Sequence, residues 1–266
     1  MTPGFTPIEL ALAAGLVLFS AGLSLVMKLG IHRALTLAAL RMTVQLLLVG
    51  LLLRAIFSSG SPWLTLGLIV IMIGAASYEV SARQRRRLRG GWTFLVSGAA
   101  VSSSTLLVAV FALASLSSSQ DWTAPAVVIP IAGIILGSAM NAASIGIGSL
   151  LETISAERMG IEARLALGHT MRQATDPLLR RAIHTGTIPV VNQMAGAGII
   201  TLPGIMSGQV LAGFDPLAAA QSQIFLMFLL SAASVGSVVI AVFLTLRRLG
   251  DDRQRLRLDR LEAART

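Results

Sequence analysis

Few side chains of this 266-residue chain could bind or pass a polar solute, because its polar residues lie mostly outside long apolar runs. Within those runs, Arg41 and Gln45 are four residues apart and so share one face of a helix. Ionisable and amide groups are costly in lipid and usually face protein or water. This pair is therefore a candidate lining of a transport pathway. Alternatively, Arg41 extends its guanidinium to the membrane surface.

Two further polar groups are candidates for the same pathway. Ser138 and Asn141 are three residues apart in one apolar run, and Asn192 and Gln193 are adjacent in another. They could line a path, or they could hydrogen-bond between neighbouring helices, as such residues often do in membranes. Glu9 could meet a cation at the start of the first run, or could serve as an ordinary helix-start carboxylate.

The chain lacks the residue patterns of catalysis and ATP hydrolysis. Its one lysine, Lys28, lies in the string MKLG, so no phosphate-binding loop ending in Gly-Lys-Ser/Thr is present. With no cysteine there is neither a disulfide nor a thiolate metal site. The apolar runs hold almost no imidazole or carboxylate, the usual ligands of iron. We expect a chain that is not an enzyme and carries no cofactor, and its metal ligands stay unknown.

The elements that position these residues are membrane-spanning helices. Hydrophobic residues make up 55% of the chain and charged residues 12%, about half the ~25% of a soluble domain. A span needs about 20 apolar residues, and the apolar runs are long enough for seven. We expect an all-α, polytopic fold. The predicted spans are 8–27, 35–53, 63–79, 94–115, 127–150, 187–206 and 219–246.

The basic residues predict the orientation of the spans. All of the 21 Lys and Arg except Arg41 and Arg54 lie in the connections 28–34, 80–93 and 151–186 or in the tail after 246. These segments fall on one side if the N-terminus is outside and the C-terminus cytoplasmic, as the positive-inside rule requires. The net charge of +9 thus reflects topology and contact with anionic lipid rather than nucleic-acid binding. We expect a multi-pass protein of the plasma membrane, in bacteria the inner membrane.

The segment 151–186 is the one large cytoplasmic element. Its pattern predicts a helix over 155–167, with Met159 as an apolar contact, that ends at Gly168. A second helix is expected to start at Asp176, with Pro177 at its first position. The predicted domains are a transmembrane domain, 1–246, with this segment inserted, and a basic tail, 247–266.

Glycine and proline are concentrated around the sixth predicted span. The pairs Gly133/Gly137 and Gly204/Gly208 form GxxxG motifs, which let helices approach closely. The block 202–216 could form an outer hinge or gate, or a re-entrant turn that does not move. The residues assigned to a possible hinge or gate are Pro203, Gly204, Gly208, Asp215 and Pro216 of this block, together with Pro189 in the sixth predicted span.

Two sets of motifs resemble known transporter sequences. Glu162, Ala163 and Arg164, with Gly168 following, are similar to the EAA-x-x-x-G loop of ABC-transporter permeases, with Arg164 in place of the last alanine. Longer strings resemble the FetB family of iron-export permeases, with Ser138 where that family has asparagine. These strings are RMTVQLLLVG (41–50), VIPIAGIILGSAM (128–140), IEARLALG (161–168) and ITLPGIMSGQVLAGFDPLAAAQSQI (200–224).

The resemblance implies a permease subunit that couples to a separate cytoplasmic ATPase through Glu162, Ala163, Arg164 and Gly168. It implies export of iron or another metal ion, since plant relatives are linked to aluminium tolerance. It also implies a second permease copy, and ATP and Mg bound on the ATPase. The alternatives are an ion channel or secondary carrier, with 151–186 as a surface linker, or a membrane scaffold. Co-purification with an ATPase separates the first reading from the others.

Overall fold

The computed structural model describes residues 6–59, 61–115 and 124–262. These residues are mainly helical, with no β-strand among them beyond isolated bridges. The helices are α1 (Pro7–Val26), α2 (His32–Ser59), α3 (Pro62–Arg83), α4 (Trp92–Ser115), α5 (Pro125–Ala156), α6 (Arg158–Ala166), α7 (Met171–Gly196), α8 (Gly204–Leu211), α9 (Pro216–Leu249) and a 3-10 turn, Leu258–Arg260. Six of the described helices, α1 to α5 and α9, are long and apolar enough to cross a membrane. The all-α polytopic fold is therefore confirmed.

The chain divides into two compact units, Met1–Ser61 and Pro62–Thr266. The first unit is a hairpin of α1 and α2. Thr6 and Glu9 form a capping box at the start of α1, in which the Thr6 N–H donates to Glu9 Oε2 at 2.7 Å. The turn into α2 uses positive φ angles at Lys28 and Gly30.

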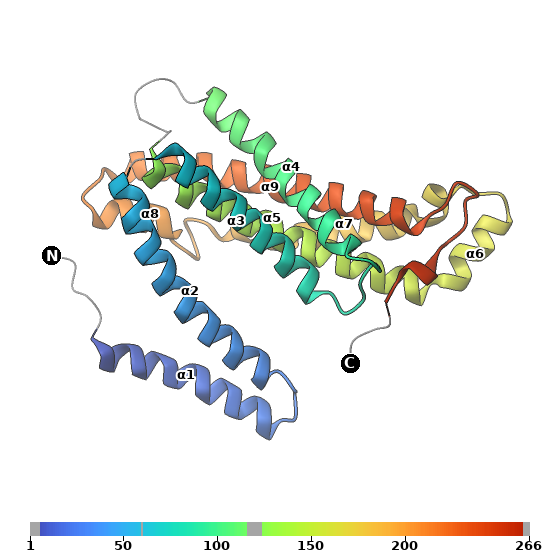
Figure 1. Cartoon of the computed structure of the whole chain (residues 1–266), viewed down its shortest axis with the longest axis horizontal. Coiled ribbons are helices and arrows are strands. Elements are labelled where there is room, and N and C mark those ends of the chain that lie inside the picture. Colours follow the sequence, from blue (N-terminus) through green and yellow to red (C-terminus); the bar gives the residue numbers. More distant parts are fainter. Residues whose placement is uncertain (1–5, 60, 116–123, 263–266) are drawn as a thin grey trace. The chain divides into compact units, whose positions relative to one another are not determined.

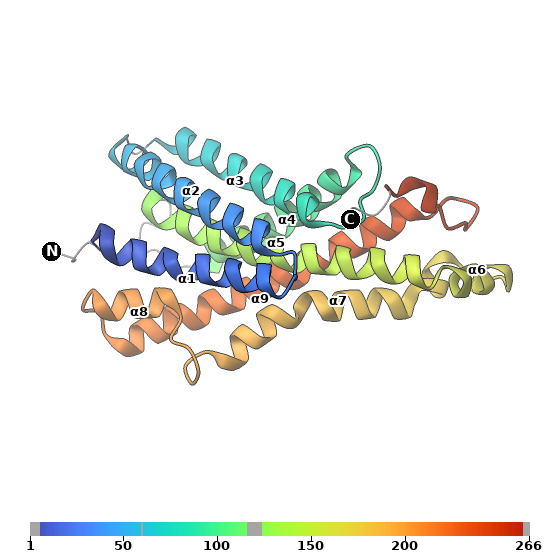
Figure 2. The same cartoon turned by 90° about the horizontal axis from the view of Figure 1, so that it is seen from below.

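The second unit is a helical bundle built around α5. Helix α5 contacts α3, α4, α7 and α9, and α9 also packs against α4 and α7. Figures 1 and 2 show α6 at one end of this unit and α8 at the other. The largest fully buried side chains of α5 include Ile147, Leu150 and Ile154, so its second half forms the centre of the core.

Two glycines allow α5, α7 and α9 to meet closely. A Cβ on Gly186 of α7 would lie 2.6 Å from Val238 Cγ2 of α9 and 2.8 Å from the Ala142 carbonyl oxygen of α5. A Cβ on Gly146 of α5 would also collide with Val238. Close packing within the chain therefore occurs here and not at the GxxxG motifs: Gly137, Gly204 and Gly208 have no heavy atom of another part of the bundle within 4 Å of an added Cβ, and Gly133 meets only the Met72 side chain.

The predicted span 187–206 is wrong in its bounds. Helix α7 begins at Met171 and ends at Gly196, a tight turn follows, and α8 begins at Gly204. The first half of α7 is too polar for α7 to qualify as a span by composition, yet α7 packs along α5 and α9 (Figure 2). The start of α7 lies beside the end of α9, because the Met171 N–H donates to Gln254 Oε1 at 2.6 Å. Helix α7 therefore returns the chain to the opposite end of the unit, where α9 begins.

The predicted helix start at Asp176 and Pro177 is also wrong. Thr170 caps α7 instead, in a capping box with Gln173: the Thr170 N–H donates to Gln173 Oε1 at 2.9 Å, and the Gln173 N–H donates to Thr170 Oγ1 at 3.3 Å. The threonine and glutamine three residues apart outweigh the Asp-Pro signal. Asp176 accepts an ion pair from Arg180 at 2.7 Å, and Pro177 lies inside the helix.

The residues after α9 are folded against the bundle. The Arg89 N–H donates to the Arg260 carbonyl at 2.8 Å, and the Glu262 N–H donates to the Arg87 carbonyl at 2.8 Å. Leu88 and Leu261, both buried, form a bridge between the two segments. We call residues 250–262 the clasp. The basic end of the second unit is then made of the α3–α4 loop (84–91), α6, the start of α7 and the clasp.

Candidate functional site

Helix α6 is the most distinctive element of the basic end, because one of its faces is anchored and the other is free. Ile161 is buried in the core and Leu165 packs against it. Glu162 and Ala163 are exposed, and Glu162 accepts an ion pair from Arg158 at 2.8 Å. Three of the four predicted coupling residues, Glu162, Ala163 and Arg164, thus lie on the exposed surface of one short helix, and Gly168 follows it.

Gly168 terminates α6 in a Schellman motif, and α7 begins three residues later. Its φ is +89°, a value that only glycine adopts without strain. The Gly168 N–H donates to the Leu165 carbonyl at 3.0 Å, and the His169 N–H donates to the Arg164 carbonyl at 3.2 Å. The predicted end of this helix is confirmed. The Arg164 guanidinium also donates to the Ala174 carbonyl at 3.1 Å, so it ties α6 to α7.

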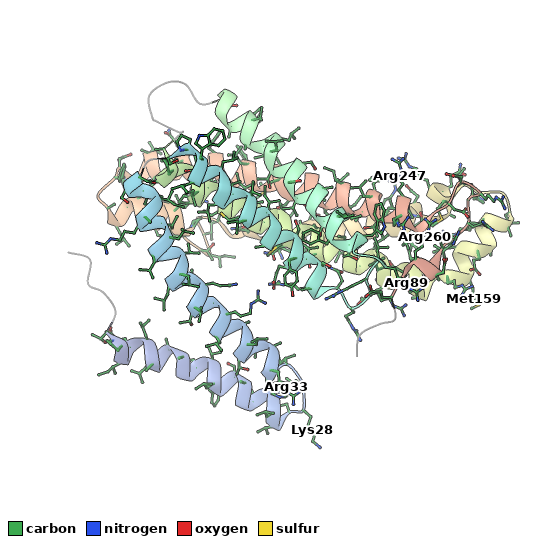
Figure 3. The ribbon with its side chains drawn as sticks, viewed as in Figure 1. Lys28, Arg33, Arg89, Met159, Arg247 and Arg260 are labelled. Atoms are coloured by element: carbon green, nitrogen blue, oxygen red, sulfur yellow. The ribbon has the colours of Figure 1, made fainter. Side chains whose placement is uncertain are left out.

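The sequence analysis did not predict that α6 carries an exposed apolar stripe. Met159 was expected to pack inward, but its side chain is 84% exposed, as Leu167 is at 80%. With Ala163 these residues recur every four positions and so share one face. Figure 3 shows Met159 pointing away from the bundle at the basic end. The signal was available: Ile161 and Leu165 occupy the opposite, buried face at the same spacing.

The predicted pathway residues lie on both units. Arg41 and Gln45 are exposed on α2, and Glu9 belongs to the capping box of α1. In the second unit, Asn192 and Gln193 are exposed on α7. Each of these side chains is therefore exposed within its own unit.

The polar groups of α5 and α7 lie at the same level of the bundle. Ser138 is half-buried and Asn141 is exposed on α5. The backbone of Gly186 faces Ala142 and Gly146, so residues before Ala142 on α5 lie level with residues after Gly186 on α7. In this antiparallel register, the amides of both helices occupy the same stretch of the bundle.

The predicted hinge residues mark helix boundaries. Pro203 is the N-cap residue of α8, and Gly204 is its first residue. Asp215 caps α9, since its Oδ2 accepts the Ala218 N–H at 2.9 Å, and Pro216 is the first residue of that helix. Pro189 lies inside α7 and Gly208 inside α8. Helix α8 is therefore flanked by two turns, with positive φ at Gly198 in the turn before it and at Gly213 in the turn after it.

Two polar features of the second unit were not foreseen. Gln84, buried after α3, donates from Nε2 to the Ser144 carbonyl at 3.0 Å and to the Val80 carbonyl at 3.0 Å. It ties the α3–α4 loop to α5, where Gly148 leaves it room. Buried hydroxyls also occur along α9, at Ser234 and Ser237. In sequence these are ordinary small residues in an apolar run, so their burial depends on packing that only the fold shows.

Among the described residues, no group of three or more His, Cys, Asp or Glu side chains lies close enough to hold a metal ion. The second unit offers instead exposed amides on α5 and α7, buried hydroxyls on α9 and a partly apolar, exposed face on α6. Such groups fit passage of a solute and contact with another protein.

Comparison with known proteins gives the family. A family model described as "Uncharacterised protein family (UPF0014)" matches residues 7–249. This chain belongs to the UPF0014 family of membrane proteins.

Several relatives are similar along most of their length. The UPF0014 membrane protein slr1647 of Synechocystis is 36% identical over 81% of this chain and 83% of its own. The protein of Escherichia coli named "Probable iron export permease protein FetB" is 32% identical over 96% of each chain. Protein ALUMINUM SENSITIVE 3 of Arabidopsis thaliana is 31% identical over 89% of this chain and 85% of its own. No solved structure matches the chain.

Proposed function

We propose that this UPF0014 protein is the permease subunit of an ABC-type exporter of iron or another metal ion in a bacterial inner membrane. The observation that carries the proposal is the similarity to the Escherichia coli permease over 96% of both chains. ATP and Mg are bound by a separate cytoplasmic ATPase, since this chain has no phosphate-binding loop.

The face of α6 that carries Met159, Ala163 and Leu167, with Glu162 beside it, is the proposed docking site for the ATPase. Large apolar side chains that are exposed outside the membrane-spanning helices commonly mark contact with another protein. Arg164 and Gly168 hold this face in place without belonging to it.

The connections of α6 suit transmission of force to the spans. Helix α5 ends at Ala156 and α6 begins at Arg158, and the Ile161 N–H donates to the Glu157 carbonyl at 3.0 Å across the junction. On its other side, α6 is tied to α7 through Arg164. A displacement of α6 by the ATPase would therefore move α5 and α7, the two helices that carry Asn141 and Asn192.

The exposed amides of α5 and α7 support a second permease copy. An amide is costly against lipid and normally faces protein or water. A second copy would cover Asn141, Asn192 and Gln193 and enclose a path between the two chains. Such a path of amides, hydroxyls and carbonyls would bind a metal ion weakly, which suits release during export.

The test is transport by the purified chain in vesicles, with and without its ATPase and ATP. We expect ATP-dependent movement of iron, or of another metal ion, that requires both proteins. The docking role is tested by Glu162→Lys, with Gly160→Ala as a control in the same helix, since an added Cβ at Gly160 meets no atom within 4 Å. Metal flux without ATPase or ATP would indicate a channel or secondary carrier instead.

A further inference from the structure

A cavity lies at the basic end of the second unit, between the first residues of α4 and the last turn of α9. It has a volume of about 620 Å³ and is lined by apolar side chains of both helices, among them Leu95, Val96 and Leu244. Its remaining walls are Trp92, Arg247, Arg248 and Arg260. The cavity is thus apolar along the helices and strongly basic at their ends.

The position of this cavity is that of a membrane interface. Trp92 is the first residue of α4, and Arg247 and Arg248 lie in the last turn of α9, which packs against α4. Tryptophan is enriched at membrane interfaces, and arginine marks the ends of spans. The apolar walls then lie at the depth of lipid chains and the arginines at the depth of lipid headgroups.

The charges around the cavity favour an anion. No carboxylate lines it, and none of the described carboxylates forms an ion pair with Arg247 or Arg248. Arg248 stacks over the Trp92 ring, with its guanidinium carbon 4.2 Å from the ring centroid. Asp251 of the clasp forms an ion pair with Arg255 at 2.8 Å.

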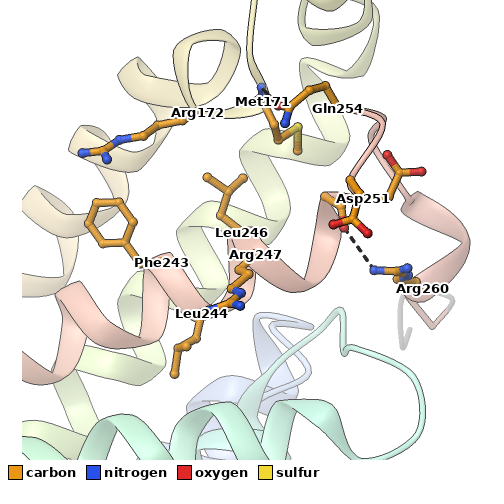
Figure 4. Close-up of a pocket in the computed structure, with 11 residues that line it drawn as sticks. Met171, Arg172, Phe243, Leu244, Leu246, Arg247, Asp251, Gln254 and Arg260 are labelled. Carbon is orange, nitrogen blue, oxygen red and sulfur yellow. Dashed lines mark hydrogen bonds between the residues drawn. The ribbon is translucent and has the colours of Figure 1, made fainter.

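Arg260 is the clasp residue that lines the cavity. Its Nη1 donates to the carbonyl oxygens of Arg248 at 2.8 Å and of Gly250 at 3.1 Å, and the latter bond is drawn in Figure 4. The guanidinium is therefore fixed beside the end of α9 rather than free in solution. It also contributes to the lowered pKa of Asp259, which is paired with Arg257.

The neighbouring cavity on the other side of α9 is a poorer site for an anion. Its lining, drawn in Figure 4, includes Arg247, Arg260 and Leu244, which also line the α4–α9 cavity. Asp251 and Asp252 also line it, so its arginines face carboxylates of the same chain. The basic, carboxylate-free walls are confined to the α4–α9 side.

We infer that the α4–α9 cavity binds one anionic phospholipid. The phosphate lies among Arg247, Arg248 and Arg260, whose planar guanidinium groups match phosphate oxygens, and an acyl chain lies along Leu95, Val96 and Leu244. Basic pockets between transmembrane helices bind anionic headgroups in this way. The lipid bridges α4, α9 and the clasp.

Trp92 makes the site measurable. In the variant Trp63→Phe/Trp122→Phe it is the only tryptophan, since the chain has three. The full-length variant is placed in phosphatidylcholine vesicles that contain a small fraction of either brominated phosphatidylglycerol or brominated phosphatidylcholine, because bromine quenches tryptophan fluorescence on contact. We expect half-maximal quenching at a mole fraction of brominated phosphatidylglycerol that is several-fold lower than the mole fraction of brominated phosphatidylcholine needed for the same effect.

Matched variants separate a site from a general surface charge. Arg247→Gln removes no hydrogen bond of the described chain. It should reduce the preference for phosphatidylglycerol over phosphatidylcholine about fivefold, which is the effect of one basic residue near a lipid surface. Arg253→Gln, in the clasp but outside the cavity, makes the same change in charge and should leave the preference intact. Equal quenching of the parent variant by both lipids would overturn the proposal. So would an equal loss in both arginine variants.

Discussion

Val238 is the residue against which α5 and α7 pack most closely, and it leaves little room for a side chain at Gly146 or Gly186. We expect Gly186→Ala to destabilise the protein by about 1–3 kcal/mol, the usual effect of overpacking, because its Cβ would meet both Val238 and the Ala142 carbonyl oxygen. Gly137→Ala, on the same bundle with no atom near the new Cβ, should change stability little. Thermal unfolding of the detergent-purified variants measures the difference.

A second substitution separates side-chain from backbone contact. Val238→Ala should partly restore the stability of Gly146→Ala, because an added Cβ there collides mainly with the Val238 side chain. The same change should restore Gly186→Ala less, since the Ala142 carbonyl stays in place. Equal rescue at both positions would contradict the packing described for Gly186.

Thr170 decides where α7 begins. Thr170→Ala should destabilise the first turn by about 0.5–2 kcal/mol, the range for loss of an N-cap, and should speed amide exchange there. Asp176→Ala removes only an exposed ion pair, worth about 0–1 kcal/mol, and should leave that turn protected. Exchange measured by mass spectrometry on both variants gives the comparison, and the reverse order would place the helix start at Asp176.

Local backbone conformation was easier to predict from the sequence than the burial and packing of side chains. The Gly168 helix end follows from the sequence, because glycine has a known preference for positive φ. The outward position of Met159 was missed, because an apolar side chain normally signals burial, although the spacing of Ile161 and Leu165 marks the buried face of the same helix. The roles of Gly146 and Gly186 could not be foreseen either, because both depend on a third helix, α9, that is far away in sequence.

At the scale of elements, the clasp depends on Arg260. Arg260→Ala removes its bonds to the carbonyls of Arg248 and Gly250. We expect faster amide exchange in residues 250–262 and at Arg89, whose N–H donates to the Arg260 carbonyl. Arg253→Ala, on the exposed surface of the clasp, should have little effect. Unchanged exchange at Arg89 would show that other contacts hold the clasp.

The clasp should also loosen in strong acid. The side-chain hydrogen bond from Arg257 lowers the pKa of Asp259 from 3.8 to about 2. A carboxyl with a depressed folded pKa stabilises the fold above its ordinary pKa and loses this effect as pH falls through the folded value. The difference in clasp protection between the wild type and Asp259→Asn, corrected for intrinsic exchange, should therefore vanish as pH drops from about 4 to about 2. A difference that persists below that range would exclude this ion pair as its cause.

The helix bounds predicted from composition agree with the structure where the helix is apolar, and they differ from it where the helix is partly polar. The six apolar helices all contain the predicted spans or lie within a few residues of them. The start of helix α7 was not predicted, because its first half carries Arg172, Arg180 and Arg181. In the sequence these arginines are typical of a surface linker. Packing against α5 and α9 compensates for this polarity, and sequence periodicity gives no measure of such contacts.

At the scale of the whole molecule, the exposed amides predict a second copy. The chain has no cysteine, so Asn192→Cys introduces a single thiol on α7. We expect this variant to form cross-linked dimers in membranes with a short thiol-specific reagent. Leu107→Cys, on an exposed apolar position of α4, is the matched control and should stay monomeric. Cross-linking at Leu107 but not at Asn192 would place the interface on another face.

The position of the clasp also bears on how the protein is made. Residues 250–262 are translated after α9, yet they cover Leu88 in a loop that leaves the ribosome much earlier. Until they arrive, this loop and the start of α7 expose apolar surface and unpaired backbone groups. Folding at this end of the second unit is therefore complete only after the clasp residues have been synthesised.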